Sequence, residues 1–286
     1  MRYALNLPNG GAWSDPRTLG ELARLAEESG WDGIFLEDYI VWQSQQDVPT
    51  YDPWISLAAM AIQTKHIRLG TNVTPLARRR PWKVAREAVT LDHLSNGRFI
   101  LGVGLGDTGE SVGSDVSFTH FSEETEAKQR AQRLDEALEV IVGLWSGKPF
   151  HYDGKYFQVQ EVSFLPRPVQ VPRIPIWVGG GWPLKGPTLR ATRWDGSRLY
   201  KHHGNSMAPD DIRALQGFVK QERGSLESYD IVVSANRQNG DEEKNRAYVR
   251  SLAEAGATWC AEYLSPNVGA VATIKARIAQ GPLSID

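Results

Sequence analysis

RLGTNVTPLARRRPWKVAREAVTLDHLSNGRFILGVGLG, residues Arg68–Gly106, is the stretch of sequence that predicts the fold. It divides into a short strand, a loop, a helix headed by Pro81, a tight Asn96-Gly97 turn and a second strand. The second strand, FILGVGLG, is almost wholly apolar, which is typical of a strand buried on both faces of a parallel sheet. The stretch therefore predicts a strand–helix–strand unit.

The same alternation of strand and helix signals continues on both sides of this unit. Strands are expected at 2–8, 33–38, 68–73, 99–106, 174–180, 197–201, 230–236 and 258–264, and a helical pattern follows each of them. Such a series in 286 residues predicts a (β/α)8 TIM barrel, and the absence of a linker predicts one domain over residues 1–286. A polar loop insertion is expected after the fourth strand and a small hairpin before the fifth.

The composition is that of an ordinary globular protein, with 41% hydrophobic and 23% charged residues. A net charge of −2 gives no reason to expect binding to nucleic acid or to a membrane surface. The sequence has neither a signal-peptide pattern nor a long apolar run, and its one cysteine, Cys260, suits a reducing compartment. We therefore expect a cytoplasmic protein.

Candidate acid and base groups follow the strands, because ligands bind at the carboxyl ends of barrel strands. Glu37, Asp38 and Tyr39 end the second strand, and His202 follows the sixth; these four are the expected catalytic residues. A metal-dependent hydrolase is the alternative, with His202 and His203 as ligands. Adjacent histidines project to opposite faces of a strand, however, and neither a zinc spacing nor a GxSxG motif is present, so no metal site is predicted.

Two glycine clusters also stand at strand ends. Residues Gly104–Gly109 match GxGxxG, but a long polar segment follows them where a dinucleotide-binding fold requires a helix. We interpret them as a place where a cofactor approaches the backbone. Residues Gly179–Gly181 lie between a strand and a helix, and they suit a phosphate held by backbone N–H groups.

Two further clusters of charged residues need no catalytic role. Residues Arg78–Arg80 form either a solvated loop or one contact to an anion. Asp92, His93 and Arg98 flank the turn at the opposite face of the barrel, so we expect a structural role, with an Asp92–Arg98 ion pair closing the turn.

The central stretch resembles the luciferase-like flavin monooxygenase family, the bacterial luciferase superfamily. The resemblance is carried by LGT at Leu69–Thr71 and by LDHLSNGRFILGVGLG at Leu91–Gly106, with support from DGIFLED and RPVQVPRIPIWVGGG. It implies a (β/α)8 barrel, often a homodimer, that binds FMN or the deazaflavin coenzyme F420. It also places a cis peptide at Asn72-Val73, against which the cofactor ring rests, and Tyr39 where deazaflavin-dependent relatives commonly carry histidine.

The cofactor-binding residues expected at this face are Asn6, Asn72, Val73, Gly104, Leu105, Gly106, Gly179, Gly180, Gly181 and Trp182. The implied activity is that of a flavin- or F420-dependent oxidoreductase, which transfers a hydride or activates O2 on a small organic substrate. A non-catalytic flavin-binding protein on the same barrel is the alternative. The sequence leaves FMN and F420 equally open, and with them monooxygenase and dehydrogenase chemistry.

Overall fold

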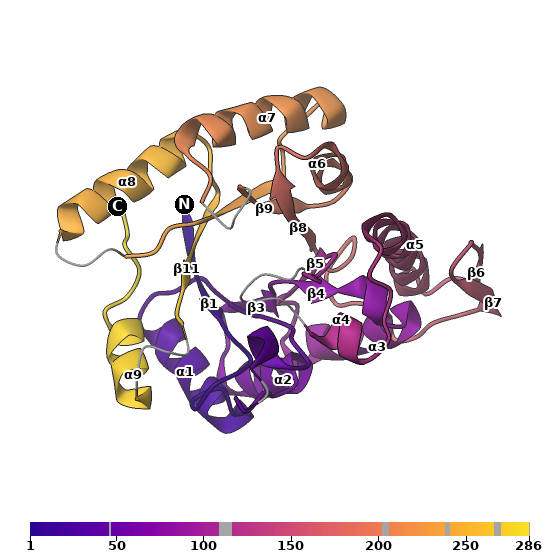
Figure 1. Cartoon of the computed structure of the whole chain (residues 1–286), viewed down its shortest axis with the longest axis horizontal. Coiled ribbons are helices and arrows are strands. Elements are labelled where there is room, and N and C mark those ends of the chain that lie inside the picture. The colour runs from indigo at the N-terminus through magenta and orange to yellow at the C-terminus, as the bar shows by residue number, and fades with distance from the viewer. Residues whose placement is uncertain (46, 109–115, 202–205, 238–240, 266–269, 286) are drawn as a thin grey trace.

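The computed structural model describes residues 1–45, 47–108, 116–201, 206–237, 241–265 and 270–285. Parallel strands occupy the centre, with α7 and α8 on one side and α1, α2 and α9 on the other (Figure 1). The strands are β1 (Arg2–Leu7), β2 (Gly33–Leu36), β3 (Arg68–Thr71), β4 (Thr74–Pro75), β5 (Phe99–Gly104), β8 (Ile176–Trp182), β9 (Gly196–Lys201), β10 (Asp230–Ser234) and β11 (Trp259–Tyr263). The main helices are α1 (Pro16–Glu28), α2 (Pro53–Gln63), α3 (Pro81–Leu94), α5 (Ala127–Trp145), α6 (Lys185–Thr192), α7 (Pro209–Arg223), α8 (Glu242–Glu254) and α9 (Val271–Ala279).

Parallel pairing closes the strands into a ring in the order β1-β2-β3-β5-β8-β9-β10-β11. β4 continues the course of β3 and also pairs with β5. This closure confirms the predicted (β/α)8 barrel. The helices begin where the sequence signals them: the side chains of Asp15 and Asp52 cap α1 and α2, and Pro16 and Pro53 occupy the first positions.

Both predicted departures from a plain barrel are present. The hairpin consists of β6 (Phe150–Asp153) and β7 (Gln158–Val162), and it projects beyond α5 in Figure 1. It is tied to that helix by Glu136, whose carboxylate accepts hydrogen bonds from the backbone N–H groups of 155–157. In the segment after β5, the described part contains the short helix α4 (Ser117–His120). The segment ends at the start of α5, where the Glu126 side chain caps the helix by accepting hydrogen bonds from two backbone N–H groups.

The inside of the barrel is filled by an aromatic floor. It consists of Ala4, Phe35, Ile100, Trp177, Val232, Trp259 and Ala261. The Phe35 and Trp177 rings stack with centroids 5.0 Å apart, and Trp177 meets Trp259 edge-on at 5.3 Å. Because these side chains fill the barrel, a ligand has room only above them, at the carboxyl ends of the strands.

The opposite face is held by polar contacts that differ from the predicted ones. Asp92 accepts hydrogen bonds from the backbone of Val169 and Gln170 and from the Gln170 side chain. Arg98 instead donates to backbone oxygens of 61, 64, 67 and 95 and to Thr64 Oγ1. In the part of the chain that the structure describes, the two make no ion pair, so the predicted Asp92–Arg98 pair is wrong. Both side chains are buried structural residues, as expected.

Gly102 gives a direct test of the strand packing. A Cβ atom at Gly102 would lie 1.9 Å from the backbone oxygen of Thr71 on β3. We expect Gly102→Ala to lower the free energy of unfolding by about 3 kcal/mol, because two neighbouring strands would have to separate. Gly186→Ala is the matched control: nothing lies within 4 Å of its added Cβ, and its stability should stay within about 1 kcal/mol of wild type. Equal urea midpoints for both variants would contradict this packing.

Candidate active site

A layer of polar side chains lies directly above the aromatic floor. Asn6, Glu37, Ser234 and Tyr263 each stand two positions after a floor residue, and alternation along a strand places them on the same inward face. The same alternation turns Arg198 inward. Gly196, two positions before it on β9, faces the floor, because a Cβ added there would meet the Trp177 ring. Asn72 joins the group through its hydrogen bond to Asn6. We call the set Asn6, Glu37, Asn72, Arg198, Ser234 and Tyr263 the inner polar layer.

Glu37 is the acid/base group of this layer. Its Oε2 accepts a hydrogen bond from Trp42 Nε1 at 2.9 Å, and Trp42 is itself buried. Burial raises the pKa of Glu37 to about 7, although the Trp42 hydrogen bond and the charge of Arg198 oppose that rise. A carboxyl with this pKa takes up and releases a proton near neutral pH, which suits general acid/base catalysis.

Arg198, on β9, contributes a positive charge to the layer. Its Nη2 donates to Ser234 Oγ at 3.4 Å, the long end of the hydrogen-bond range. Burial lowers the pKa of Arg198 to about 10, while the nearby Cys260 and Glu37 oppose the shift, so the guanidinium stays charged at neutral pH. Among the residues that the structure describes, no carboxylate lies within 4.0 Å of it.

Tyr263 ends β11 with its hydroxyl turned into the layer. The oxygen is buried and has no hydrogen-bond partner among the described residues. Burial, together with the charges of Glu37 and Tyr39, raises the pKa of the phenol, so it remains a donor. Beside it on β1 stands Asn6, whose Oδ1 accepts from Asn72 Nδ2 at 2.8 Å.

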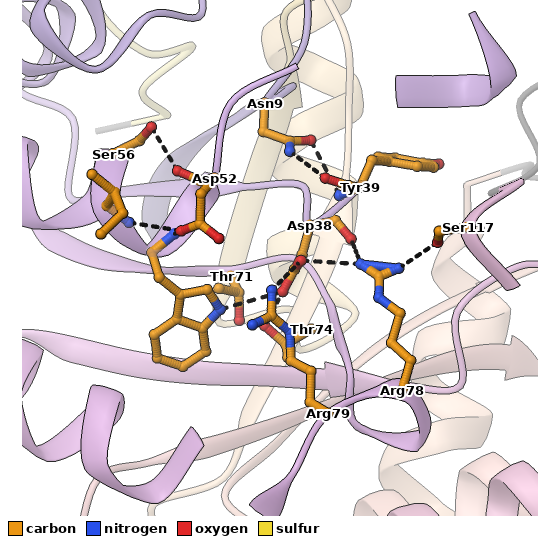
Figure 2. A network of polar contacts seen from close by, with 12 residues as sticks. Asn9, Asp38, Tyr39, Asp52, Ser56, Thr71, Thr74, Arg78, Arg79 and Ser117 are labelled. Atoms are coloured by element: carbon orange, nitrogen blue, oxygen red, sulfur yellow. Dashed lines mark hydrogen bonds and ion pairs between the residues drawn. The ribbon is translucent and has the colours of Figure 1, made fainter. Parts of the chain in front are cut away.

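Asp38 faces away from this layer, although it follows Glu37 directly. Its carboxylate accepts hydrogen bonds from Arg79 at 2.7 Å, Arg78 at 3.1 Å, Thr74 at 2.9 Å and Trp54 at 3.3 Å (Figure 2). Burial by itself raises the pKa of this carboxyl, but the two guanidinium groups and their hydrogen bonds outweigh it and hold the pKa below its ordinary value. The geometry is that of a buried structural junction.

The arginines predicted as a charged loop serve this junction. Arg78 donates to both the backbone and the side chain of Asp38, and also to Ser117 Oγ at 3.0 Å (Figure 2). It therefore links the end of β2 to α4 in the segment after β5.

Tyr39, another predicted catalytic residue, is held by Asn9. The Asn9 side chain accepts a hydrogen bond from the Tyr39 backbone N–H and donates one to the Tyr39 carbonyl oxygen.

The strand-end glycines are packed against the protein's own side chains. A Cβ at Gly104 or at Gly179 would lie 2.6 or 2.7 Å from the methyl groups of Val73. The structure thus brings Val73, Gly104 and Gly179 together, and the Asn72-Val73 peptide is cis, as the family resemblance implies. Their contact with a cofactor remains a prediction.

The other predicted cofactor residues lie along the same rim. A Cβ at Gly180 would meet Pro187, and one at Gly181 would approach Leu184, so β8 packs closely on the start of α6. Trp182 Nε1 donates to Asp211 of α7 at 3.3 Å.

The loop after β5 is fixed by a residue that the sequence did not suggest. Arg130 of α5 donates to the backbone oxygens of Leu105 and Gly106, both at 2.9 Å, and to Thr108 Oγ1 at 3.1 Å. Gly106 has a positive φ of 74°, which suits glycine there.

Arg198 and Tyr263 were also missed, and strand alternation was the signal that would have found them. His202 lies outside the described residues, so its predicted catalytic role stays a prediction. Within the described residues, no three His, Cys, Asp or Glu side chains are grouped to hold a metal ion. None of the described helices has the length and apolar character needed to cross a membrane.

Residues 3–267 match the luciferase-like monooxygenase family, and the chain belongs to that family. It is 36% identical over 171 residues to an F420-dependent glucose-6-phosphate dehydrogenase of Microbacterium testaceum, covering 59% of this chain and 48% of that protein. A protein of the same name from Gordonia bronchialis is 34% identical over 223 residues, covering 72% of this chain and 64% of the relative. The chain thus spans about half the length of most of these curated relatives.

Solved structures share the fold at low sequence identity. The F420-dependent tetrahydromethanopterin reductase of Methanopyrus kandleri superposes with a TM-score of 0.76 at 18% identity, over 98% of each chain. Monooxygenase RslO1 of Streptomyces bottropensis gives 0.77 at 18% identity, over 97% of this chain and 96% of that one. These similarities support the barrel assignment.

Proposed function

We propose that the protein is an oxidoreductase that uses F420 or FMN to act on a small organic substrate at the mouth of the barrel. The observation that carries the proposal is Glu37, a carboxyl with a pKa of about 7 turned into the inner polar layer above a sealed aromatic floor. Membership of the luciferase-like family supports it, as do relatives named as F420-dependent dehydrogenases. F420 is therefore the first cofactor to test, and FMN the second.

The residues at the mouth fit such a cofactor. Val73, between Gly104 and Gly179, would form the wall against which the ring lies. A bound cofactor of this class supplies a carbon or nitrogen centre that exchanges a hydride with the substrate.

The chain's own part in the chemistry is positioning and proton handling. The aromatic floor excludes water from below. Glu37, oriented by Trp42, holds or accepts the substrate's proton at its carboxylate. Asp38 and Arg78 fix the loops around this group and do not reach the reacting atoms.

Cofactor binding tests the proposal. Purified protein is titrated with F420 and separately with FMN, while tryptophan fluorescence is followed; ten tryptophans, two of them in the floor, give the signal. We expect a dissociation constant in the micromolar range for one of them, and binding of neither would refute the proposal. Bound reduced cofactor that no oxidant ever reoxidises would favour the non-catalytic alternative.

We also propose a homodimer, as the family resemblance implies. Ile55 and Ile62 of α2 are 65% and 69% exposed, so this helix presents apolar side chains outward. Light scattering after size exclusion gives the mass directly, and a monomer at micromolar concentration would contradict the proposal.

A further inference from the structure

The inner polar layer holds several hydrogen-bond donors on the inward face of the strands, above the aromatic floor. Arg198 has five N–H donors, and its described protein partner is the single Ser234 oxygen at 3.4 Å. Tyr263 contributes a buried hydroxyl with no acceptor among the described residues. Glu37 adds an O–H donor whenever it is protonated. A ligand that satisfies this set must supply acceptor atoms.

The charge of the layer points the same way. The Arg198 guanidinium is partly buried and has no carboxylate partner among the described residues, so it favours any anion that reaches it. Glu37, the acidic group whose charge acts on Arg198 from across the barrel, is protonated in about half of the molecules near neutral pH. At or below that pH the layer therefore carries a net positive charge.

We propose that Arg198, with the Tyr263 hydroxyl, binds a carboxylate group of the substrate. The proposal rests on the function proposed above, since it treats the mouth of the barrel as the substrate site. A carboxylate has only acceptor atoms, and its two oxygens match the paired N–H groups of a guanidinium. Arg198 is then a specificity-determining residue that selects carboxylates over neutral analogues of the same shape.

A carbonyl oxygen of the cofactor is the other source of acceptor atoms. The cofactor wall is expected at Val73, whose methyl groups fill the space beside Gly104 and Gly179. Arg198 stands in register with Gly179 but on the next strand, β9, and it leans toward Ser234 on β10. This direction takes the guanidinium away from Val73, toward the strands that carry Tyr263, and favours the substrate as its partner.

Calorimetric titration of the full chain with benzoate, and with benzamide as its neutral isostere, tests the proposal without turnover. We expect benzoate to bind at least about tenfold more tightly than benzamide. Arg198→Met is expected to weaken benzoate binding about tenfold or more and to leave benzamide binding unchanged. Arg24→Met is the matched control, because Arg24 is exposed and paired with Glu28 on α1; it should bind benzoate like wild type.

The pH dependence separates this role from a structural one. Ionised Glu37 repels a carboxylate, so benzoate binding should weaken as pH rises through about 7, while Glu37→Gln should bind benzoate with little pH dependence. A retained circular dichroism spectrum and melting temperature show that each variant is folded.

The outcomes for the two proposals are distinct. Equal binding of benzoate and benzamide, or unchanged benzoate binding in Arg198→Met, overturns the carboxylate subsite. A tenfold loss of F420 or FMN affinity in Arg198→Met with no effect on benzoate overturns it as well, and makes Arg198 a cofactor contact. Benzoate binding that depends on Arg198, in a protein that binds neither cofactor, supports the subsite while refuting the proposed oxidoreductase.

Discussion

Asp38→Ala is expected to lower the free energy of unfolding by about 3–5 kcal/mol, because it removes the buried carboxylate that pairs with both Arg78 and Arg79. The side chains of Asp38 and Arg78 are each 1% exposed, and that of Arg79 is 20% exposed, so solvent replaces little of the lost interaction. Thr74 and Trp54 would also lose their acceptor. Urea unfolding followed by tryptophan fluorescence measures the loss.

Two further variants define its cause. Asp38→Ala combined with Arg79→Met should recover part of the stability, because one uncompensated charge is removed. Asp210→Ala is the surface control: Asp210 is 96% exposed in its pair with Arg213, so its loss should cost less than about 1 kcal/mol. A loss at Asp38 as small as at Asp210 would show that the junction in Figure 2 contributes little.

The same junction has a pH signature with a definite sign. The pKa of Asp38 is lower in the folded than in the unfolded protein, so its stabilisation is fully present above the unfolded pKa of about 4. The stabilisation is lost as pH falls through the folded pKa. The advantage of wild type over Asp38→Asn should therefore shrink as the solution is acidified below about pH 4.

The fold was predictable because its local signals agree with one another. Asp15 with Pro16 and Asp52 with Pro53 mark helix starts that the structure reproduces as side-chain caps. The Asn96-Gly97 turn has positive φ at both residues, as its sequence indicates. The short β4 was not predicted, because its two residues are too few to show a strand pattern in the sequence.

The orientation of the site residues was not predictable from sequence. GIFLED, residues 33–38, is apolar at every position before its two carboxylates, so it carries no alternation that would show which side faces the barrel axis. Only packing shows that Phe35 belongs to the floor, and hence that Glu37 faces the mouth while Asp38 joins the arginines. For the same reason both carboxylates appeared equally catalytic.

Strand β9 did carry a usable signal. In GSRLYK, Arg198 precedes an outward, buried Leu199 and stands two positions after Gly196, so the period of the strand turns it inward. An arginine directed into a barrel is uncommon enough to indicate function. The partners of Asp92 lie at 169 and 170, and all partners of Arg98 but Ser95 lie at 61 to 67. No local pattern in the sequence reveals contacts over such distances along the chain.

The unfolding free energy of Glu37→Gln minus that of wild type is expected to rise by about 3 kcal/mol between acid pH and a pH above 7. Folding raises the pKa of Glu37 to about 7 from its ordinary 4.5, because the carboxyl is buried. The folded state therefore holds more protons than the unfolded state between these values. The stabilisation that belongs to the protonated carboxyl is complete below about pH 4.5 and is lost as pH rises through about 7. Glutamine retains an acceptor for Trp42 and does not titrate.

The measurement is the difference in unfolding free energy between Glu37→Gln and wild type at a series of pH values from about 4.5 to about 8.5. Asp38 is common to both proteins, so its titration cancels. Glu161→Gln is the control, since Glu161 is exposed on β7, and its difference from wild type should show no comparable rise between about pH 4.5 and about pH 7. A flat difference for Glu37→Gln would mean that this carboxyl is ionised throughout, and it would remove the proton donor on which the proposed chemistry depends. A rise between about pH 4.5 and about pH 7 that levels off at higher pH would instead show that the fold holds a neutral acid at the mouth of the barrel at the expense of its own stability.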